Sequence, residues 1–147
     1  MDYFTTINEC RYLSLANISE IESNYLKLVV EEAVVSEESE DHFVGDVPIG
    51  KVHPIITTAA CRKFEIIFER YIAYVVLNES FASVDKSEKC EGRLYRICES
   101  STFLDYLKQA TFASDQYPGP FKLYCFGCMD HIIEVASPSE PLIRMYY

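Results

Sequence analysis

The sharpest pattern of chemically active residues is a pair of cysteines followed by a histidine, Cys125-x2-Cys128-x2-His131. Thiolates and imidazoles bind Zn²⁺, and thiolates close in sequence can turn toward one metal ion. A fourth ligand has to come from elsewhere in the chain, with Cys90 or Cys98 as candidates. On a strand, however, Cys125 and Cys128 point to opposite faces, because an odd number of positions separates them. We therefore expect no metal and no cofactor, and these three residues are the candidates if a metal does bind.

The six cysteines could also supply a nucleophile or disulfides. A Cys–His nucleophile needs His42, His53 or His131 beside a cysteine, and no spacing in the sequence specifies such a pair. A thioredoxin-like redox pair requires a strand-to-helix setting, which Cys125 and Cys128 lack. Several cysteines lie inside apolar patterns, where a thiol behaves as a small hydrophobe. We expect all six to be reduced, and we expect a protein that is not an enzyme.

Carboxylates are concentrated in the first third of the chain. Residues 1–50 carry 11 acidic side chains against Arg11 and Lys27, whereas residues 51–147 carry 12 acids against 11 bases. Residues 36–46 lack the D-x-D-x-D-G order of a calcium loop. The acidic field disfavours nucleic acid and anionic membranes and favours a basic protein partner. The predicted partner-binding residues lie in the densest part of this region: Glu31, Glu32, Glu37, Glu38, Glu40 and Asp41.

The composition is that of an ordinary folded protein. The chain has 147 residues, 49% of them hydrophobic and 24% charged, which predicts one domain over residues 1–147. Eleven Tyr and nine Phe without Trp favour β structure. No charge-free apolar run is long enough to span a membrane, and the first residues, MDYFTTINECRY, carry an acid where a secretory signal is basic. We expect a cytoplasmic protein.

The longest apolar stretch, Lys63 to Phe81, predicts the central strand of the fold. Up to Phe68 the apolar residues fall on even positions, which is the period of a strand with one buried face. From Tyr71 onward both parities are apolar, so we expect the second half to be covered on both faces. A single strand of this length would reach about 50 Å, far beyond the usual range, so the stretch must bend or break near Arg70.

The remaining elements follow from shorter patterns. Their sum predicts an α+β fold: one strongly curved, mainly antiparallel sheet of about seven strands with one main helix. Residues 36–46 are expected to form an exposed acidic loop, residues 47–51 a turn and residues 82–92 a linker. The helix is expected at about 102–112, and further strands are expected at 10–18, 24–35, 52–60 and 93–98, in a hairpin of 121–128 with 131–136, and at the C-terminus.

Three segments carry a resemblance to other proteins: FERYIAYVVLNESF, GRLYRICESSTFLDYLKQATFA and MDHIIEVASPSEP. Over roughly residues 64–141 the chain resembles small acidic bacterial proteins of unassigned activity, of the kind connected with immunity or partner proteins of bacterial toxin systems. The shared motifs are structural, and they include no set of catalytic residues. The resemblance therefore implies a binding role.

Two hypotheses for the function follow. The first is a non-enzymatic interaction protein whose acidic N-terminal third binds a basic partner, with a toxin domain in an immunity pair as the leading example. The second is a small-molecule or metal-binding module in the mouth of the curved sheet. Its predicted lining consists of Tyr71, Tyr74, Tyr95 and Tyr124.

Overall fold

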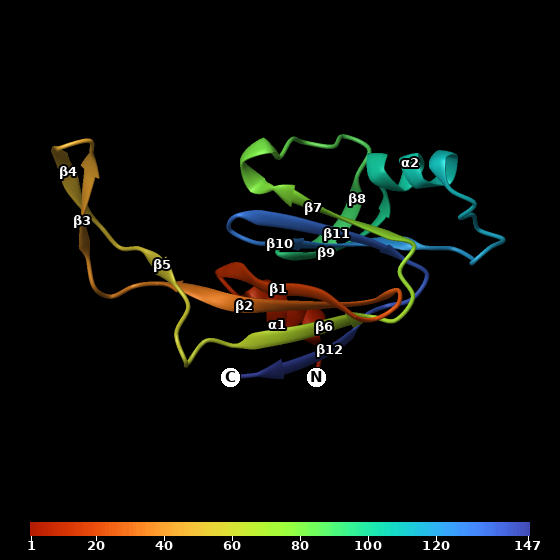
Figure 1. Ribbon diagram of the computed structural model, residues 1–147, viewed down its shortest axis with the longest axis horizontal. Coiled ribbons are helices and arrows are strands. Elements are labelled where there is room, and N and C mark those ends of the chain that lie inside the picture. Colours follow the sequence, from red (N-terminus) through yellow and green to blue (C-terminus); the bar gives the residue numbers. More distant parts are fainter.

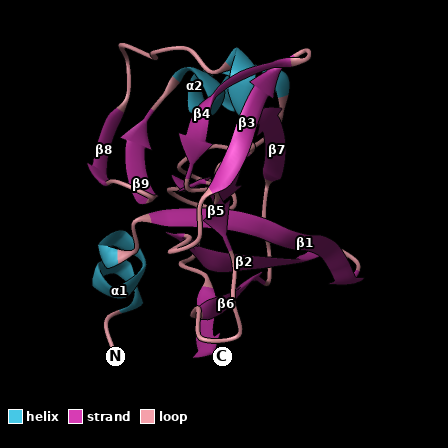
Figure 2. Ribbon diagram, turned by 90° about the vertical axis from the view of Figure 1, so that its left-hand side faces the viewer, coloured by secondary structure: helices cyan, strands magenta, loops and turns pink.

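Two antiparallel sheets lie face to face and enclose most of the apolar side chains in the computed structural model, which describes residues 1–147 (Figures 1 and 2). The first sheet consists, in spatial order, of β1 (Tyr12–Glu22), β2 (Tyr25–Val35), β6 (Lys63–Phe68) and β12 (Leu142–Tyr146), and the short β5 (Ile55–Ile56) pairs with the end of β2. The second sheet consists of β7 (Ala73–Asn78), β11 (His131–Ser137), β10 (Lys122–Gly127), β9 (Tyr95–Ser100) and β8 (Lys89–Gly92).

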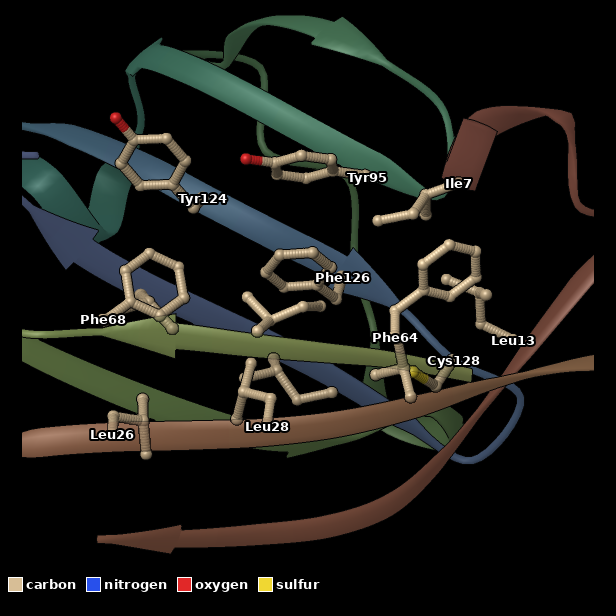
Figure 3. Packing of buried hydrophobic residues seen from close by; sticks show 14 of the residues in the cluster. Ile7, Leu13, Leu26, Leu28, Phe64, Phe68, Tyr95, Tyr124, Phe126 and Cys128 are labelled. Carbon is tan, nitrogen blue, oxygen red and sulfur yellow. The ribbon is translucent and has the colours of Figure 1, made fainter. Parts of the chain in front are cut away.

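The core between the sheets follows the period-2 patterns of their strands. Along β2 and β6 every second side chain is buried, because one face of each strand is turned toward the other sheet. The second sheet contributes the opposite layer from β10 and β11 (Figure 3). The largest fully buried side chains of this core are Ile7, Leu13, Leu26, Leu28, Phe64, Ile66, Phe68, Phe126 and Ile133.

The predicted α+β class and antiparallel pairing are confirmed, but the predicted single curved sheet of about seven strands is wrong. The chain forms twelve strands, distributed over two open sheets and a separate hairpin. The stretch from Lys63 to Phe81 explains the difference. It breaks between Phe68 and Ala73, as predicted near Arg70, and its two halves enter opposite sheets as β6 and β7.

The expectation that the second half of this stretch is covered on both faces is wrong. β7 is an edge strand of the second sheet and pairs only with β11. Tyr74, Val76 and Leu77 each keep more than a third of their surface exposed. Side chains of an edge strand have a neighbouring strand on one side only, so they keep more of their surface exposed, and the local sequence does not specify which strands become edges.

Two α-helices complete the fold. The predicted helix is confirmed as α2 (Thr102–Ala110): Ser101 caps its N-terminus, and Leu104 and Leu107 pack on the outer face of the second sheet. A second helix, α1 (Tyr3–Glu9), was missed. Asp2 caps α1 by accepting hydrogen bonds from the amides of Phe4 and Thr5, and Ile7 enters the core. Neither helix has the length and apolar character needed to cross a bilayer.

Segments predicted as irregular contain further strands. Residues 36–46 and 47–51 form β3 (Glu40–Val44) and β4 (Val47–Val52), which are joined in a hairpin, and the end of the predicted linker forms β8. The predicted strand at 52–60 is reduced to the two residues of β5. Charge and proline content predicted loops in these segments, but pairing with a neighbouring strand stabilises them as strands.

Candidate interaction surface

The β3–β4 hairpin projects away from the two sheets and stands alone at one end of the molecule (Figure 1). We call residues 40–52, from the start of β3 to the end of β4, the arm. Its two strands pair only with each other, every one of their residues is exposed, and no arm residue takes part in the three salt bridges of the molecule. The two packed sheets therefore position the arm without covering it.

The sequence of the arm explains its hairpin. Val44 pairs with Val47, so Gly45 and Asp46 form the two-residue turn. Gly45 has a φ of 63°, a conformation that costs glycine little because it has no Cβ. A register shift follows His42, which leaves one extra residue in β4 and twists the pair.

The arm combines exposed apolar side chains with carboxylates. Phe43, Val44, Val47 and Ile49 are each more than half exposed. A two-stranded hairpin with nothing packed against it is marginally stable in water, and a cluster of exposed apolar side chains marks a contact surface. The acidic side chains at the base and tip of the arm are Glu37, Glu38, Glu40, Asp41 and Asp46, all exposed.

The predicted partner-binding residues fall into two groups. Glu37, Glu38, Glu40 and Asp41 lie together on the arm or just before it, and all four are exposed. Glu31 lies on β2, half-buried, away from this group. Two of the six predicted residues therefore lie on the arm, and two more lie in the segment that leads into it.

Glu32, the sixth predicted residue, is held inside the molecule. The Arg62 Nε and Nη2 atoms each donate to a different carboxylate oxygen of Glu32 at 2.9 Å, and the Arg62 amide donates to the same carboxylate at 3.2 Å. These hydrogen bonds hold the pKa of Glu32 below its ordinary value. Glu32 is therefore a structural ion-pair residue that joins β2 to the chain before β6.

The three predicted metal candidates do not come together. Cys125 belongs to the cluster under α2 on the outer face of the second sheet, whereas Cys128 belongs to the core between the sheets. Burial raises the pKa of each of these two thiols to about 12. His131 begins β11, and its carbonyl oxygen accepts a hydrogen bond from the Cys128 amide. The opposite directions of Cys125 and Cys128 follow from the alternation of side chains that the sequence predicts.

The expectation that all six cysteines are reduced is wrong, because Cys90 and Cys98 form a disulfide. β8 and β9 pair in a register that places these two residues directly opposite each other, with their Cα atoms 4.0 Å apart. The Cys125 Sγ atom lies 4.0 Å from the Cys98 Sγ atom. Sequence reasoning named Cys90 and Cys98 only as distant candidates for a fourth metal ligand, and it placed Cys90 in a linker, so it did not predict their pairing.

The four tyrosines of the alternative hypothesis do not line an open mouth. Tyr95 and Tyr124 are only 4% and 3% exposed, and both point into the core, where Tyr95 stacks on Phe126 (Figure 3). Burial raises the pKa of Tyr124 to about 12 and raises the pKa of Tyr95 as well. Tyr71 and Tyr74 pack edge to face, with ring centroids 5.1 Å apart. The predicted tyrosine site is therefore wrong: its two central members are core residues.

A hollow of about 530 Å³ lies over the outer face of the second sheet, between residues 81–85 and the start of α2. Its polar side includes Glu88, Arg96 and Glu134, and Arg96 Nη1 donates to a Glu88 carboxylate oxygen at 2.7 Å. Burial, and then the charge of Glu88, raises the pKa of Glu134 above its ordinary value, while Arg96 opposes this rise. Sequence reasoning missed these residues because their strands are adjacent only in the folded sheet.

The raised pKa of the Glu134 carboxyl predicts that this residue contributes to stability in a pH-dependent way. A carboxyl with a raised folded pKa contributes fully below its ordinary pKa of 4.5, and its contribution is lost as pH rises through the folded pKa. Glu134→Gln should therefore gain stability relative to wild type between pH 4 and pH 7, as measured by urea unfolding at several pH values. The control is Glu99→Gln, whose side chain is exposed. Parallel stability curves for wild type and Glu134→Gln would contradict this assignment.

Comparison with known proteins does not add a function to the arm, the Glu32–Arg62 ion pair or the group of three cysteine sulfurs. No family model, no curated protein and no solved structure matches the chain.

Proposed function

We propose that this protein is a non-enzymatic interaction protein whose arm binds a basic surface on a protein partner. The observation that carries the proposal is the projecting β3–β4 hairpin, which exposes apolar side chains beside five carboxylates and a single lysine, Lys51. Carboxylates at the rim of an interface accelerate encounter with a basic surface, and desolvated apolar side chains slow dissociation. Both requirements are met on one element.

The leading partner class is a basic toxin domain, which would make this chain an immunity protein of a bacterial toxin system that acts in the cytoplasm. Two features support this class. The net charge of −10 is concentrated in the N-terminal third, where the arm lies. Residues 64–141, which form the second sheet and most of β6 in the first, carry the resemblance to small acidic bacterial proteins. In this proposal the two packed sheets serve as a rigid base for the arm.

The test is a kinetic measurement of binding between the purified protein and a basic bacterial toxin domain. A charge variant combines Glu37→Gln, Glu38→Gln, Glu40→Gln and Asp41→Asn. We expect slower association by about tenfold at low salt and a flatter dependence of the association rate on ionic strength. An apolar variant, Phe43→Ser with Ile49→Ser, should instead dissociate at least about tenfold faster, because these side chains lose contact area.

The matched control neutralises four exposed carboxylates outside the arm: Glu91→Gln, Glu99→Gln, Asp105→Asn and Asp115→Asn. It changes the net charge by the same amount, so it separates a local docking site from a general effect of charge. Equal slowing by the control would contradict the arm as the docking site. Unchanged kinetics in both arm variants would overturn the proposal.

A further inference from the structure

Three cysteine sulfurs and one carboxylate come together where β8, β9 and β10 lie side by side on the outer face of the second sheet. A carboxylate oxygen of Glu88 and the Sγ atoms of Cys90 and Cys98 all lie within 4.8 Å of one another. The Cys125 Sγ atom is 4.0 Å from the Cys98 Sγ atom and points to the same face of the sheet. The sheet thus gathers three potential ligand atoms from residues 88–98 and a fourth from Cys125, 27 positions after Cys98.

These four groups are the ligand types of a zinc site. In a tetrahedral Zn²⁺ site with Zn–S bonds of about 2.3 Å, two sulfurs lie about 3.8 Å apart. The 4.0 Å between the Cys98 and Cys125 sulfurs is close to this separation. Both residues are fixed by the central strands of the sheet, so the pair is already placed before a metal binds. Thiolate ligands favour Zn²⁺ over Ca²⁺ or Mg²⁺.

The surroundings of the cluster also suit a cation. Arg96 Nη1 donates to one carboxylate oxygen of Glu88 at 2.7 Å, which orients this side chain and leaves its second oxygen free to act as a ligand. Three thiolates and one carboxylate around Zn²⁺ carry a net charge of −2, and the Arg96 guanidinium offsets part of it. Leu104 and Leu107 of α2 pack into the same cluster as Cys98 and Cys125 and exclude water from their side.

The Cys90–Cys98 disulfide makes this site dependent on redox state. A sulfur that is bonded to another sulfur has no thiolate to offer a metal. An external dithiol can reduce the bond: it transfers two electrons and two protons, yields two free thiols and is itself oxidised to a disulfide. Cys90 and Glu88 are partly exposed, so a reductant and a cation can reach the cluster from solvent.

We infer that the reduced protein binds one Zn²⁺ through Glu88, Cys90, Cys98 and Cys125, and that the Cys90–Cys98 disulfide closes this site. Binding releases the protons of the three thiols to solvent, and the carboxylate binds in its ionised form. The site is distinct from the arm and does not depend on the proposed partner. It gives the outer face of the second sheet a metal-binding function that is available only under reducing conditions.

The test is a Co²⁺ titration of the full-length protein after reduction with a phosphine, followed by displacement with Zn²⁺. We expect one equivalent of Co²⁺ per chain, with thiolate-to-cobalt charge-transfer absorption and the visible bands of tetrahedral cobalt. The loss of an outer-shell partner typically weakens metal binding 10–100-fold, so Cys90→Ser and Cys125→Ser should each weaken it by at least about 100-fold. The matched controls, Cys61→Ser and Cys128→Ser, replace buried cysteines elsewhere and should bind normally. The unreduced protein should bind no Co²⁺.

A second measurement uses the wild-type protein and so does not depend on whether the variants fold. The rate at which iodoacetamide alkylates Cys90 is followed by peptide mass spectrometry, with and without one equivalent of Zn²⁺ after reduction. We expect zinc to slow this alkylation at least about tenfold, because a metal-bound thiolate is shielded from the reagent. Unchanged alkylation of Cys90 would overturn the inference. So would a cobalt spectrum that survives Cys125→Ser but is lost in Cys128→Ser.

Discussion

Phe126→Ala is expected to lower the free energy of unfolding by about 3–5 kcal/mol, the range for removing a large aromatic side chain from a packed core. Phe126 is fully buried on β10 between the two sheets. Its ring stacks on Tyr95 with centroids 4.6 Å apart and meets the edge of Phe68 at 6.5 Å (Figure 3). Tyr95 belongs to the second sheet and Phe68 to the first, so the Phe126 ring joins the two layers.

The measurement is urea unfolding followed by circular dichroism, with the midpoint and the slope fitted separately. The molecule supplies matched controls in Phe112 and Phe81, which are 97% and 84% exposed. Replacing either exposed phenylalanine with alanine should change the stability by less than about 0.5 kcal/mol. A similar small loss for Phe126→Ala would mean that the two sheets do not pack as described.

Asn8→Ala is expected to cost about 2–4 kcal/mol, because one side chain satisfies several backbone groups at once. Asn8 Oδ1 accepts hydrogen bonds from the amides of Arg93, Leu94 and Tyr95 at 2.8–3.0 Å. Asn8 Nδ2 donates to the Tyr95 carbonyl at 2.9 Å. The side chain thereby fixes the turn between β8 and β9 against the end of α1. Without it, these partly buried amides lose their acceptor.

The variant Asn8→Asp distinguishes the contribution of the Asn8 Oδ1 acceptor from that of the Asn8 Nδ2 donor. A carboxylate keeps the oxygen that receives the three amides, but it places a second acceptor oxygen against the Tyr95 carbonyl in place of the donor. Because three hydrogen bonds are kept and one contact becomes repulsive, we expect a smaller loss of stability than in Asn8→Ala. Hydrogen exchange at the amides of residues 93–95 should accelerate strongly in Asn8→Ala and much less in Asn8→Asp. Asn17→Ala, at an exposed position of β1, serves as the control and should alter neither measurement. Slow exchange at residues 93–95 in Asn8→Ala would contradict the role of this side chain.

Local sequence patterns predicted the elements whose burial is regular. The alternation of Leu26, Leu28 and Val30 identified β2 and its buried face, and the break near Arg70 followed from strand length alone. The apolar side formed by Phe103, Leu104 and Leu107 predicted α2, and the cap is Ser101, which was an alternative to Thr102 in the sequence. These features are visible because each depends on neighbours within a few residues.

The division into two sheets could not be predicted in the same way. β6 and β7 are consecutive in the chain, yet they pair with strands of different sheets. Which strands pair depends on contacts between distant segments, which periodicity does not encode. The arm and β8 were missed for a related reason: charge, glycine and proline favour loops, but backbone pairing with an adjacent strand outweighed these local preferences.

The candidate interaction surface was predicted in part. Charge density alone selected Glu37, Glu38, Glu40 and Asp41, all of which are exposed at the start of the hairpin or just before it. Charge density could not reveal that Arg62, thirty positions further along the chain, binds Glu32 inside the molecule. The pairing of Cys90 with Cys98 likewise depends on the register of β8 against β9.

Hydrogen–deuterium exchange of this protein, alone and in complex with a basic bacterial toxin domain, decides whether the arm is the docking element. In the free protein the amides of residues 40–52 should exchange quickly, because a hairpin with nothing packed against it opens readily. Complex formation should slow exchange in this segment more than anywhere else in the chain. Protection that falls on the edge of β7 or on the hollow over Glu134, with the arm unchanged, would contradict the account.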